Sequence, residues 1–191
     1  MFYRLSRLTF CLALMTICWP ATSTAAQTSN KPLAGYNAVI VEKATVEKNP
    51  KLAKFPAGYD TDLQQKIVAD LQKKDVFAEV IDAGIKPSNE ALVVDTSSPN
   101  NKRLLLSITI IDFSPGNKAL RYTVGWGAGA TKVKAKFVFT DAATGREIFN
   151  TTLQGKFLGF VTIHGTGKDY GITEASGDIV DSLIRVINKN R

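Results

Sequence analysis

The residues with the strongest chemical signal form a glycine-rich segment, Gly125–Ala130, which reads GWGAGA. Glycines let a backbone approach a phosphate closely, and a helix that follows them offers its N-terminus to the anion. Here the residues that follow alternate as in a strand, and no Gly-Lys-Ser/Thr sequence is present. The segment therefore favours a bent strand or a loop. Binding of a nucleotide or another small ligand at residues 125–130 is the alternative.

The other residue types that commonly carry catalysis do not converge in this sequence. His164 is the only histidine, and one histidine cannot build the usual multi-histidine zinc site. Asp112, Asp141 and Asp169 fall at a strand end, in a turn and in a loop, so no pair is held together for general acid–base work. Turns and caps are their expected roles. We therefore expect no catalytic residue, no metal site, no cofactor and no enzyme activity.

Three lysines alternate with apolar residues in the segment 132–141, which reads KVKAKFVFTD. In a strand, Lys132, Lys134 and Lys136 would share one face at intervals of about 6.6 Å. Such a row is typical of a solvated face or a protected sheet edge, and it is also suited to an anionic envelope polymer or lipid. Aromatic residues do not interleave with the lysines, so we expect no nucleic-acid partner.

The first 26 residues have the features of a cleavable secretory signal. Arg4 and Arg7 precede an apolar stretch, Leu8–Trp19, and small residues lead to Ala26. The stretch is about 12 residues long, against the roughly 20 that span a bilayer. We expect cleavage after Ala26, with cleavage after Ala25 as the alternative, and a location in the periplasm or at the outer membrane. That cleavage would remove both cysteines, and the loss of two arginines would lower the net charge from +7 to +5.

The periodicity of the remaining chain predicts a flexible lead-in at residues 27–35 and a single domain at 36–191. Strands are expected at 36–46, 76–81, 104–113, 132–141 and 147–157. A helix is expected to begin at a capping box of Thr61 and Gln64, and a second helix is expected at 173–188. This order predicts an α+β fold with a single mixed, mainly antiparallel sheet of about five strands and two helices packed on one face.

The segment 111–147 resembles a bacterial family of secreted proteins and lipoproteins, the domain of unknown function DUF4410. The resemblance rests on an ordered set of residues with a strand end, a glycine-rich segment, an alternating strand and a turn. These residues are Phe113, Pro115, Gly116, Asn117, Arg121, Gly125, Gly127, Ala128, Gly129, Asp141, Ala142, Thr144 and Gly145.

The resemblance implies an envelope protein that works through contacts. The family is distantly similar to accessory domains of curli secretion and to the amino-terminal part of the Tol–Pal periplasmic protein. This implies a non-enzymatic interaction module with an envelope protein as its partner, and peripheral association with a membrane is compatible with it. Many members carry a lipidation motif, whereas Cys11 and Cys18 of this chain follow Phe10 and Ile17, which are poor contexts for it.

Overall fold

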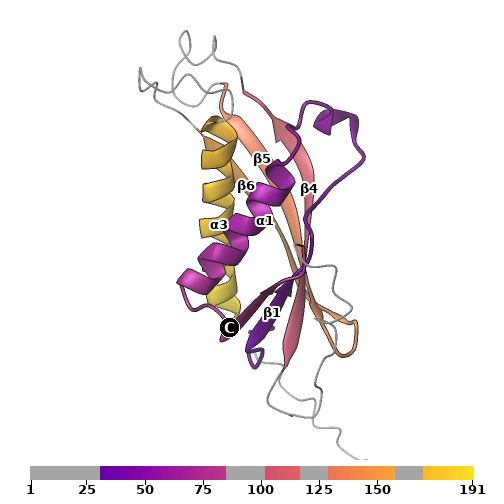
Figure 1. Cartoon of the computed structure of the whole chain (residues 1–191), viewed down its shortest axis with the longest axis vertical. Helices are drawn as coiled ribbons and strands as arrows, with labels where there is room; N and C mark the ends of the chain where they lie inside the picture. Colours follow the sequence, from indigo (N-terminus) through magenta and orange to yellow (C-terminus); the bar gives the residue numbers. More distant parts are fainter. Residues whose placement is uncertain (1–30, 85–101, 117–128, 158–169) are drawn as a thin grey trace, which may run out of the picture.

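The computed structural model describes residues 31–84, 102–116, 129–157 and 170–191 of the chain (Figure 1). Within these ranges the elements follow one another in this order: β1 (Ala38–Val41), β2 (Thr45–Val46), the short 3-10 helix η1 (Pro50–Leu52), α1 (Tyr59–Lys73), β3 (Glu79–Asp82), β4 (Arg103–Ser114), β5 (Thr131–Asp141), β6 (Glu147–Phe157) and α3 (Tyr170–Asn190).

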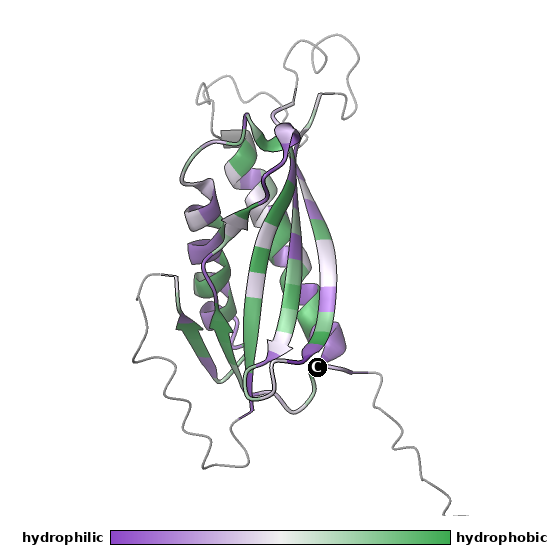
Figure 2. Cartoon of the chain, turned by 90° about the vertical axis from the view of Figure 1, so that its right-hand side faces the viewer, coloured by the Kyte–Doolittle hydropathy of each residue, from purple (hydrophilic) through white to green (hydrophobic). Residues whose placement is uncertain are grey.

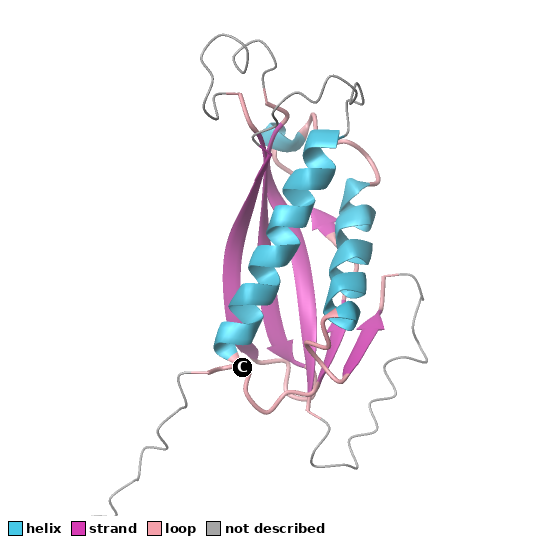
Figure 3. Cartoon of the chain, turned by 90° about the vertical axis from the view of Figure 1, so that its left-hand side faces the viewer, coloured by secondary structure: helices cyan, strands magenta, loops and turns pink. Residues whose placement is uncertain are grey.

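The strands form one mixed sheet with the order β3-β1-β4-β5-β6, and β2 also pairs with β4. β1 is parallel to both β3 and β4, whereas β4, β5 and β6 form two long antiparallel ladders. Figure 3 shows α1 and α3 side by side on one face of this sheet. The predicted α+β fold, with two helices on one face of a mainly antiparallel sheet, is confirmed.

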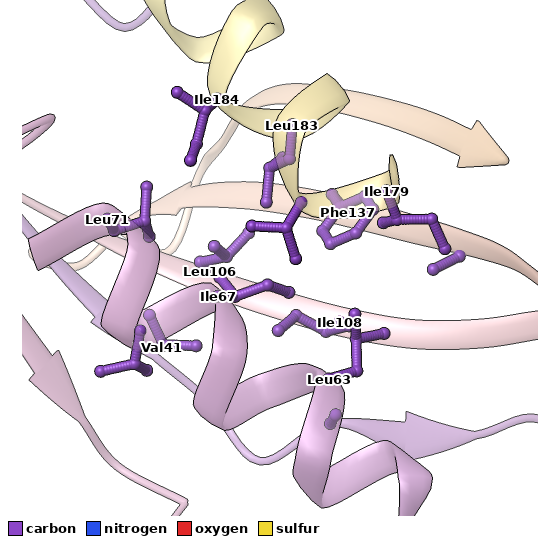
Figure 4. Close-up of a cluster of buried hydrophobic side chains, with 14 of the residues drawn as sticks. Val41, Leu63, Ile67, Leu71, Leu106, Ile108, Phe137, Ile179, Leu183 and Ile184 are labelled. Carbon is purple, nitrogen blue, oxygen red and sulfur yellow. The ribbon is translucent and has the colours of Figure 1, made fainter. Parts of the chain in front are cut away.

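The core lies between the helices and the sheet (Figure 4). Inward-facing positions of β4 and β5 alternate with positions on the other face, as the period of two in a strand requires. Apolar residues of α1 and α3 recur every three or four positions and meet them. The fully buried members of this cluster include Leu104, Leu106, Ile108, Ile110, Phe137 and Phe139 from the sheet, and Leu63, Ile67, Leu71, Ile179, Leu183 and Ile187 from the helices.

Two predictions are wrong, the continuous strand at 36–46 and the capping box of α1, and both differences involve the buried side chain of Gln64. The strand is interrupted at 42–44, and Gly58, not Thr61, precedes the first residue of α1. Gln64 is 2% exposed, and its side-chain Oε1 accepts the backbone N–H of Ala44 at 2.9 Å. Its Nε2 donates to Oδ1 of Asp82 at 2.6 Å. Gln64 lies on the inner face of α1, so its side chain does not cap the helix. It instead accepts the backbone N–H of Ala44, in the segment that interrupts the expected strand.

The packed domain begins before residue 36. Leu33 lies in the segment 27–35 that the sequence predicts to be a flexible lead-in, yet its side chain is fully buried. Its backbone N–H donates to the carbonyl of Asn190 at the end of α3, at 2.9 Å. Leu33 lies between Pro32 and Ala34 and belongs to no periodic apolar pattern, so the sequence does not signal its burial. Residues 31–35 therefore belong to the domain, and residues 27–30 lie outside the described ranges.

Candidate interaction surface

Both long helices of the described ranges, α1 and α3, pack on one face of the sheet, and Figure 2 views the molecule from the opposite side. Because successive strand residues point to opposite faces, the neighbours of the buried Val133, Ala135 and Phe137 point away from the helices. We call the resulting surface the outer sheet face. Its residues on β4, β5 and β6 include Leu105, Ser107, Thr109, Asp112, Ser114, Lys132, Lys134, Lys136, Val138, Thr140, Glu147, Asn150, Thr152, Gln154 and Lys156.

The structure brings the three predicted lysines onto this surface and adds a fourth. Lys132 and Lys136 are exposed and Lys134 is half-buried. Lys156 of β6 is the direct cross-strand partner of Lys132, at a separation of about 5 Å between their Cβ atoms. The sequence does not predict the role of Lys156, because its alignment with Lys132 depends on the register of the β5–β6 hairpin. That register includes an irregularity between Phe139 and Thr140.

The charges of this surface are unbalanced. Lys134 is opposite Asp112 of β4, whereas Lys132 and Lys156 are opposite each other. Among the described residues, no carboxylate lies within ion-pair distance of any of the four lysines. Like charges that face each other across a sheet are mildly destabilising. The arrangement is therefore suited to holding several negative charges at once.

The signature residues in the described ranges lie at the two ends of β5. Pro115, Gly116 and Gly129 flank the β4–β5 connection, where the Thr131 hydroxyl donates to the Pro115 carbonyl at 3.1 Å. Gly116 and Gly129 have φ angles of 76° and 73°, which glycine adopts most readily. The turn of Asp141 and Gly145 lies at the opposite end, about 34 Å away along the strand. These two groups therefore do not form one site.

Asp141 organises the turn between β5 and β6. Its Oδ1 accepts the backbone N–H groups of Ala143 and Thr144, at 3.0 and 2.8 Å, and the Thr144 hydroxyl at 3.0 Å. Its Oδ2 accepts the hydroxyl of Tyr36, which precedes β1, at 2.8 Å. Gly145 completes the turn with a φ of 68°. The carboxylate thus holds the hairpin turn to the N-terminal part of the domain.

This network shifts the pKa values of its two titratable groups in opposite directions. Burial, followed by the hydrogen bond and the charge of Asp141, raises the pKa of Tyr36 to about 12. For Asp141, burial opposes ionisation, but the hydrogen bonds from Tyr36, Thr144 and Ala143 outweigh it and lower the pKa below its usual value. Both shifts favour the same state, with a neutral tyrosine and an ionised carboxylate.

The remaining candidate residues fall outside the described ranges. They are Asn117, Arg121, Gly125, Gly127, Ala128, His164 and Asp169. Within the described ranges, no group of three or more histidine, cysteine, aspartate or glutamate side chains is arranged to hold a metal ion. None of the helices in that part of the chain combines the length and apolarity needed to cross a membrane.

The described structure defines a two-layer α+β domain, with helices on one face of a mixed sheet and a basic surface on the other. Comparison with protein families makes the assignment specific, because the model of the family described as "Domain of unknown function (DUF4410)" matches residues 22–168. The chain belongs to this family, as its sequence predicts. A comparison with curated proteins gave no match.

Comparison with solved structures finds similarities at low sequence identity. The PelC dodecamer from Paraburkholderia phytofirmans is 18% identical, with a TM-score of 0.48 over 82% of this chain and 91% of that one. Protein XCC0632 from Xanthomonas campestris is 11% identical, with a TM-score of 0.45 over 78% and 81%. Lipoprotein GNA1162 from Neisseria meningitidis is 15% identical, with a TM-score of 0.39 over 80% and 96%.

Proposed function

We propose that this protein is a secreted, envelope-associated interaction module that binds an anionic partner through its outer sheet face and catalyses no reaction. The observation that carries the proposal is the set of four lysines, Lys132, Lys134, Lys136 and Lys156, on one face of the β5–β6 hairpin, in the part where the register is regular. Their backbones are fixed by the ladders of β4, β5 and β6, so the spacing of the charges is set before a partner binds. A preset spacing lowers the entropic cost of binding.

The signal-like residues 1–26 and the family resemblance support an envelope location. The preferred partner is an envelope protein with an acidic surface. Exposed charges of one sign raise the association rate of an oppositely charged partner and weaken its binding at high salt. The Debye length falls from about 10 Å at 0.1 M salt to about 3 Å at 1 M. Binding through the outer sheet face should therefore be strong at low salt and lost at high salt.

The test is a crosslinking capture of the tagged protein from fractionated cells, quantified by mass spectrometry. A triple variant, Lys132→Glu, Lys134→Glu and Lys136→Glu, should lose the acidic envelope proteins that the unaltered protein captures. A matched control, Lys51→Glu, Lys54→Glu and Lys73→Glu, changes the net charge equally at exposed lysines of η1, the following loop and α1. Equal recovery by both variants would overturn the proposal, as would reproducible turnover of a substrate by the purified protein.

The same four lysines favour a second candidate, binding of anionic lipid or an anionic envelope polymer. Sedimentation with vesicles separates the two. Vesicles of phosphatidylcholine alone and vesicles that also contain phosphatidylglycerol differ in surface charge only. Binding to the charged vesicles that the triple variant loses and the control keeps would assign the surface to lipid. Absence of vesicle binding, together with capture of an acidic protein, would assign it to a protein partner.

Binding of a small ligand by residues 125–130 is the remaining alternative, and most of that segment lies outside the described ranges. A bound ligand raises the melting temperature, because it stabilises the folded state alone. A thermal-shift panel of nucleotides therefore separates the two functions. The interaction module predicts no shift, and a nucleotide-binding protein predicts a shift that grows with the nucleotide concentration.

A further inference from the structure

β6 forms one edge of the sheet, and no strand of the described ranges pairs with its outer side. It spans 11 residues, Glu147–Phe157, which is long for an unprotected edge. Natural edge strands are protected by proline, by charged side chains, by bulges, by a covering helix or loop, or by their short length. β6 contains no proline and a single lysine, Lys156. Asn150, Thr152 and Gln154 along it are exposed.

One hydrogen bond shows which backbone groups point outward. The N–H of Lys156 donates to Oδ2 of Asp178 on α3, at 3.1 Å, so it points away from β5. Backbone groups of an antiparallel strand alternate between its two sides. The register with β5 is regular from Phe149 to Phe157. The N–H and C=O groups of Asn150, Thr152 and Gln154 therefore also point to the free edge.

The register irregularity gives this edge a second charge. Phe139 pairs with Phe149, but Thr140 pairs with Glu147, so β6 has one extra residue. Glu147 consequently occupies the outer-face position that Ile148 would take in a regular ladder. Its side chain accepts a hydrogen bond from the Asn150 amide, which is also on that face. The outer side of β6 thus carries an acid near its beginning and a base, Lys156, near its end.

We infer that two copies of this chain pair through β6, antiparallel and about a two-fold axis at Thr152. In this register Thr152 faces Thr152 of the second copy, and Asn150 faces Gln154. Glu147 then faces Lys156 on each side of the axis. Cross-strand threonine pairs and opposite charges are favourable neighbours in sheets. The three outward-facing residues would form about six backbone hydrogen bonds across the axis.

Charge selects this register over its neighbours. A shift of the axis to Thr151 would place Glu147 opposite Gln154 and Lys156 opposite the hairpin turn of the second copy, so neither charge would face an opposite charge. A shift to Leu153 would place Lys156 opposite Asn150 and leave Glu147 without a cation. Asp178 already accepts the Lys156 N–H, so the ladder ends at Gln154. The edge is therefore complementary to itself, as a symmetric interface requires.

A two-fold axis perpendicular to the sheet keeps both outer sheet faces on the same side. The pair would have one continuous sheet, with all helices on one face and eight lysines on the other. This inference does not depend on the proposed function, because it concerns the β6 edge and not an anionic partner. If both hold, the pair presents two basic surfaces to one partner, and its avidity exceeds that of a single copy.

The first test is sedimentation velocity of the purified protein over a range of concentrations, with Thr152→Pro as the disrupting variant. Proline removes the outward N–H at the axis, and it leaves the β5 ladder intact because that N–H is not used there. The unaltered protein should dimerise with rising concentration, and Thr152→Pro should stay monomeric with an unchanged circular dichroism spectrum. A protein that is monomeric at every accessible concentration would overturn the inference.

A charge swap tests the register itself. Lys156→Glu and Glu147→Lys should each weaken the dimer by about tenfold or more, because each places like charges opposite each other twice. An equimolar mixture of these two variants should recover dimers, since a mixed pair restores both opposite-charge contacts. Lys54→Glu, an exposed lysine away from β6, should change nothing. Dimers that persist in Thr152→Pro, or that ignore the charge swap, use another surface and contradict the inference.

Discussion

At the scale of single residues, Asp141 and Tyr36 show how the family signature acts structurally. The turn Asp141–Gly145 needs a carboxylate to accept two backbone N–H groups and a glycine at positive φ. The sequence predicts that Asp141 begins a turn, because aspartate and glycine are typical turn residues. It does not predict the contact with Tyr36, which is 105 positions away. The sequence therefore predicts hydrogen bonds within the turn, but it does not predict a hydrogen bond to a residue far away in the chain.

The lowered pKa of Asp141 predicts acid sensitivity. A carboxyl group whose pKa is lower in the folded state stabilises the fold above its unfolded pKa, and this contribution is lost as the pH falls through the folded pKa. The unfolded value is about 3.9. Asp141→Asn should therefore be less stable than the unaltered protein at pH 7, and the difference should shrink below about pH 4. Urea unfolding from pH 7 to pH 3 measures it, and a constant difference would contradict the assignment.

The raised pKa of Tyr36 predicts that the folded state loses stability at alkaline pH. Its folded pKa of about 12 is above the usual value of about 10, so its contribution to stability is complete below pH 10 and is lost as the pH rises towards 12. Tyr36→Phe removes the hydroxyl and should flatten this part of the stability profile. Unfolding followed between pH 8 and pH 11.5 tests the prediction. A profile that Tyr36→Phe leaves unchanged would assign the alkaline loss to other groups.

At the scale of elements, the close approach of α3 to β6 is set by Gly155. A Cβ at this position would lie inside contact distance of the Ala175 carbonyl and 2.8 Å from Cγ1 of Ile179. The backbone of α3 cannot move aside as a flexible side chain could. Gly155 therefore fixes the height of α3 above the sheet.

Gly155→Ala should destabilise the fold by about 1–3 kcal/mol, because the helix must shift or strain. Gly177, on α3 itself, offers a matched control. A Cβ there would meet only Cε of Lys66 at 3.6 Å, an ordinary contact. Gly177→Ala should stabilise the fold by about 0.5–1 kcal/mol, because alanine is the better helix former. Urea unfolding of both variants measures the effects, and equal effects would show that α3 is free to adjust.

The elements also show where sequence patterns succeed and where they fail. The expected ranges 104–113, 132–141 and 147–157 agree with β4, β5 and β6 within a residue at each end, because alternation and a tight turn are local properties. The interruption after β1 was missed, because it depends on Gln64, which is distant in the sequence. The fourth lysine was missed for a similar reason, since its partner follows from an extra residue in the hairpin.

At the scale of the whole molecule, stability and the proposed binding use opposite faces of one sheet. The helices and the inner face supply the buried apolar area, whereas the outer sheet face holds the unpaired positive charge. Evolution often retains locally unfavourable residues where function needs them. The Lys132–Lys156 pair is locally unfavourable in this sense, because the sheet would be more stable if either lysine faced an acid or a neutral residue.

Lys132→Gln should therefore raise stability slightly, by about 0.2–1 kcal/mol at low salt, while it weakens binding of the anionic partner. Added salt should shrink the stability gain, because it screens the repulsion in the unaltered protein. Lys54→Gln is the control and should change neither property. Chemical denaturation at two salt concentrations, together with the capture assay, provides the measurement. A loss of stability in Lys132→Gln would mean that the lysine makes a favourable contact.

The hydrogen bond from Leu33 to Asn190 places the beginning and the end of the packed domain at one pole of the molecule. Arg191 strengthens this closure, since its guanidinium donates to the Tyr36 carbonyl at 3.2 Å and lies 4.8 Å from the Phe77 ring centre. The turn of Asp141 is at the same pole, through Tyr36. A tether attached at Lys31 would therefore suspend the domain by this pole. Among the described residues, Pro115 and Gly116 would lie at the opposite end of the domain, and the side chains of the four lysines would point perpendicular to the line that joins the two ends.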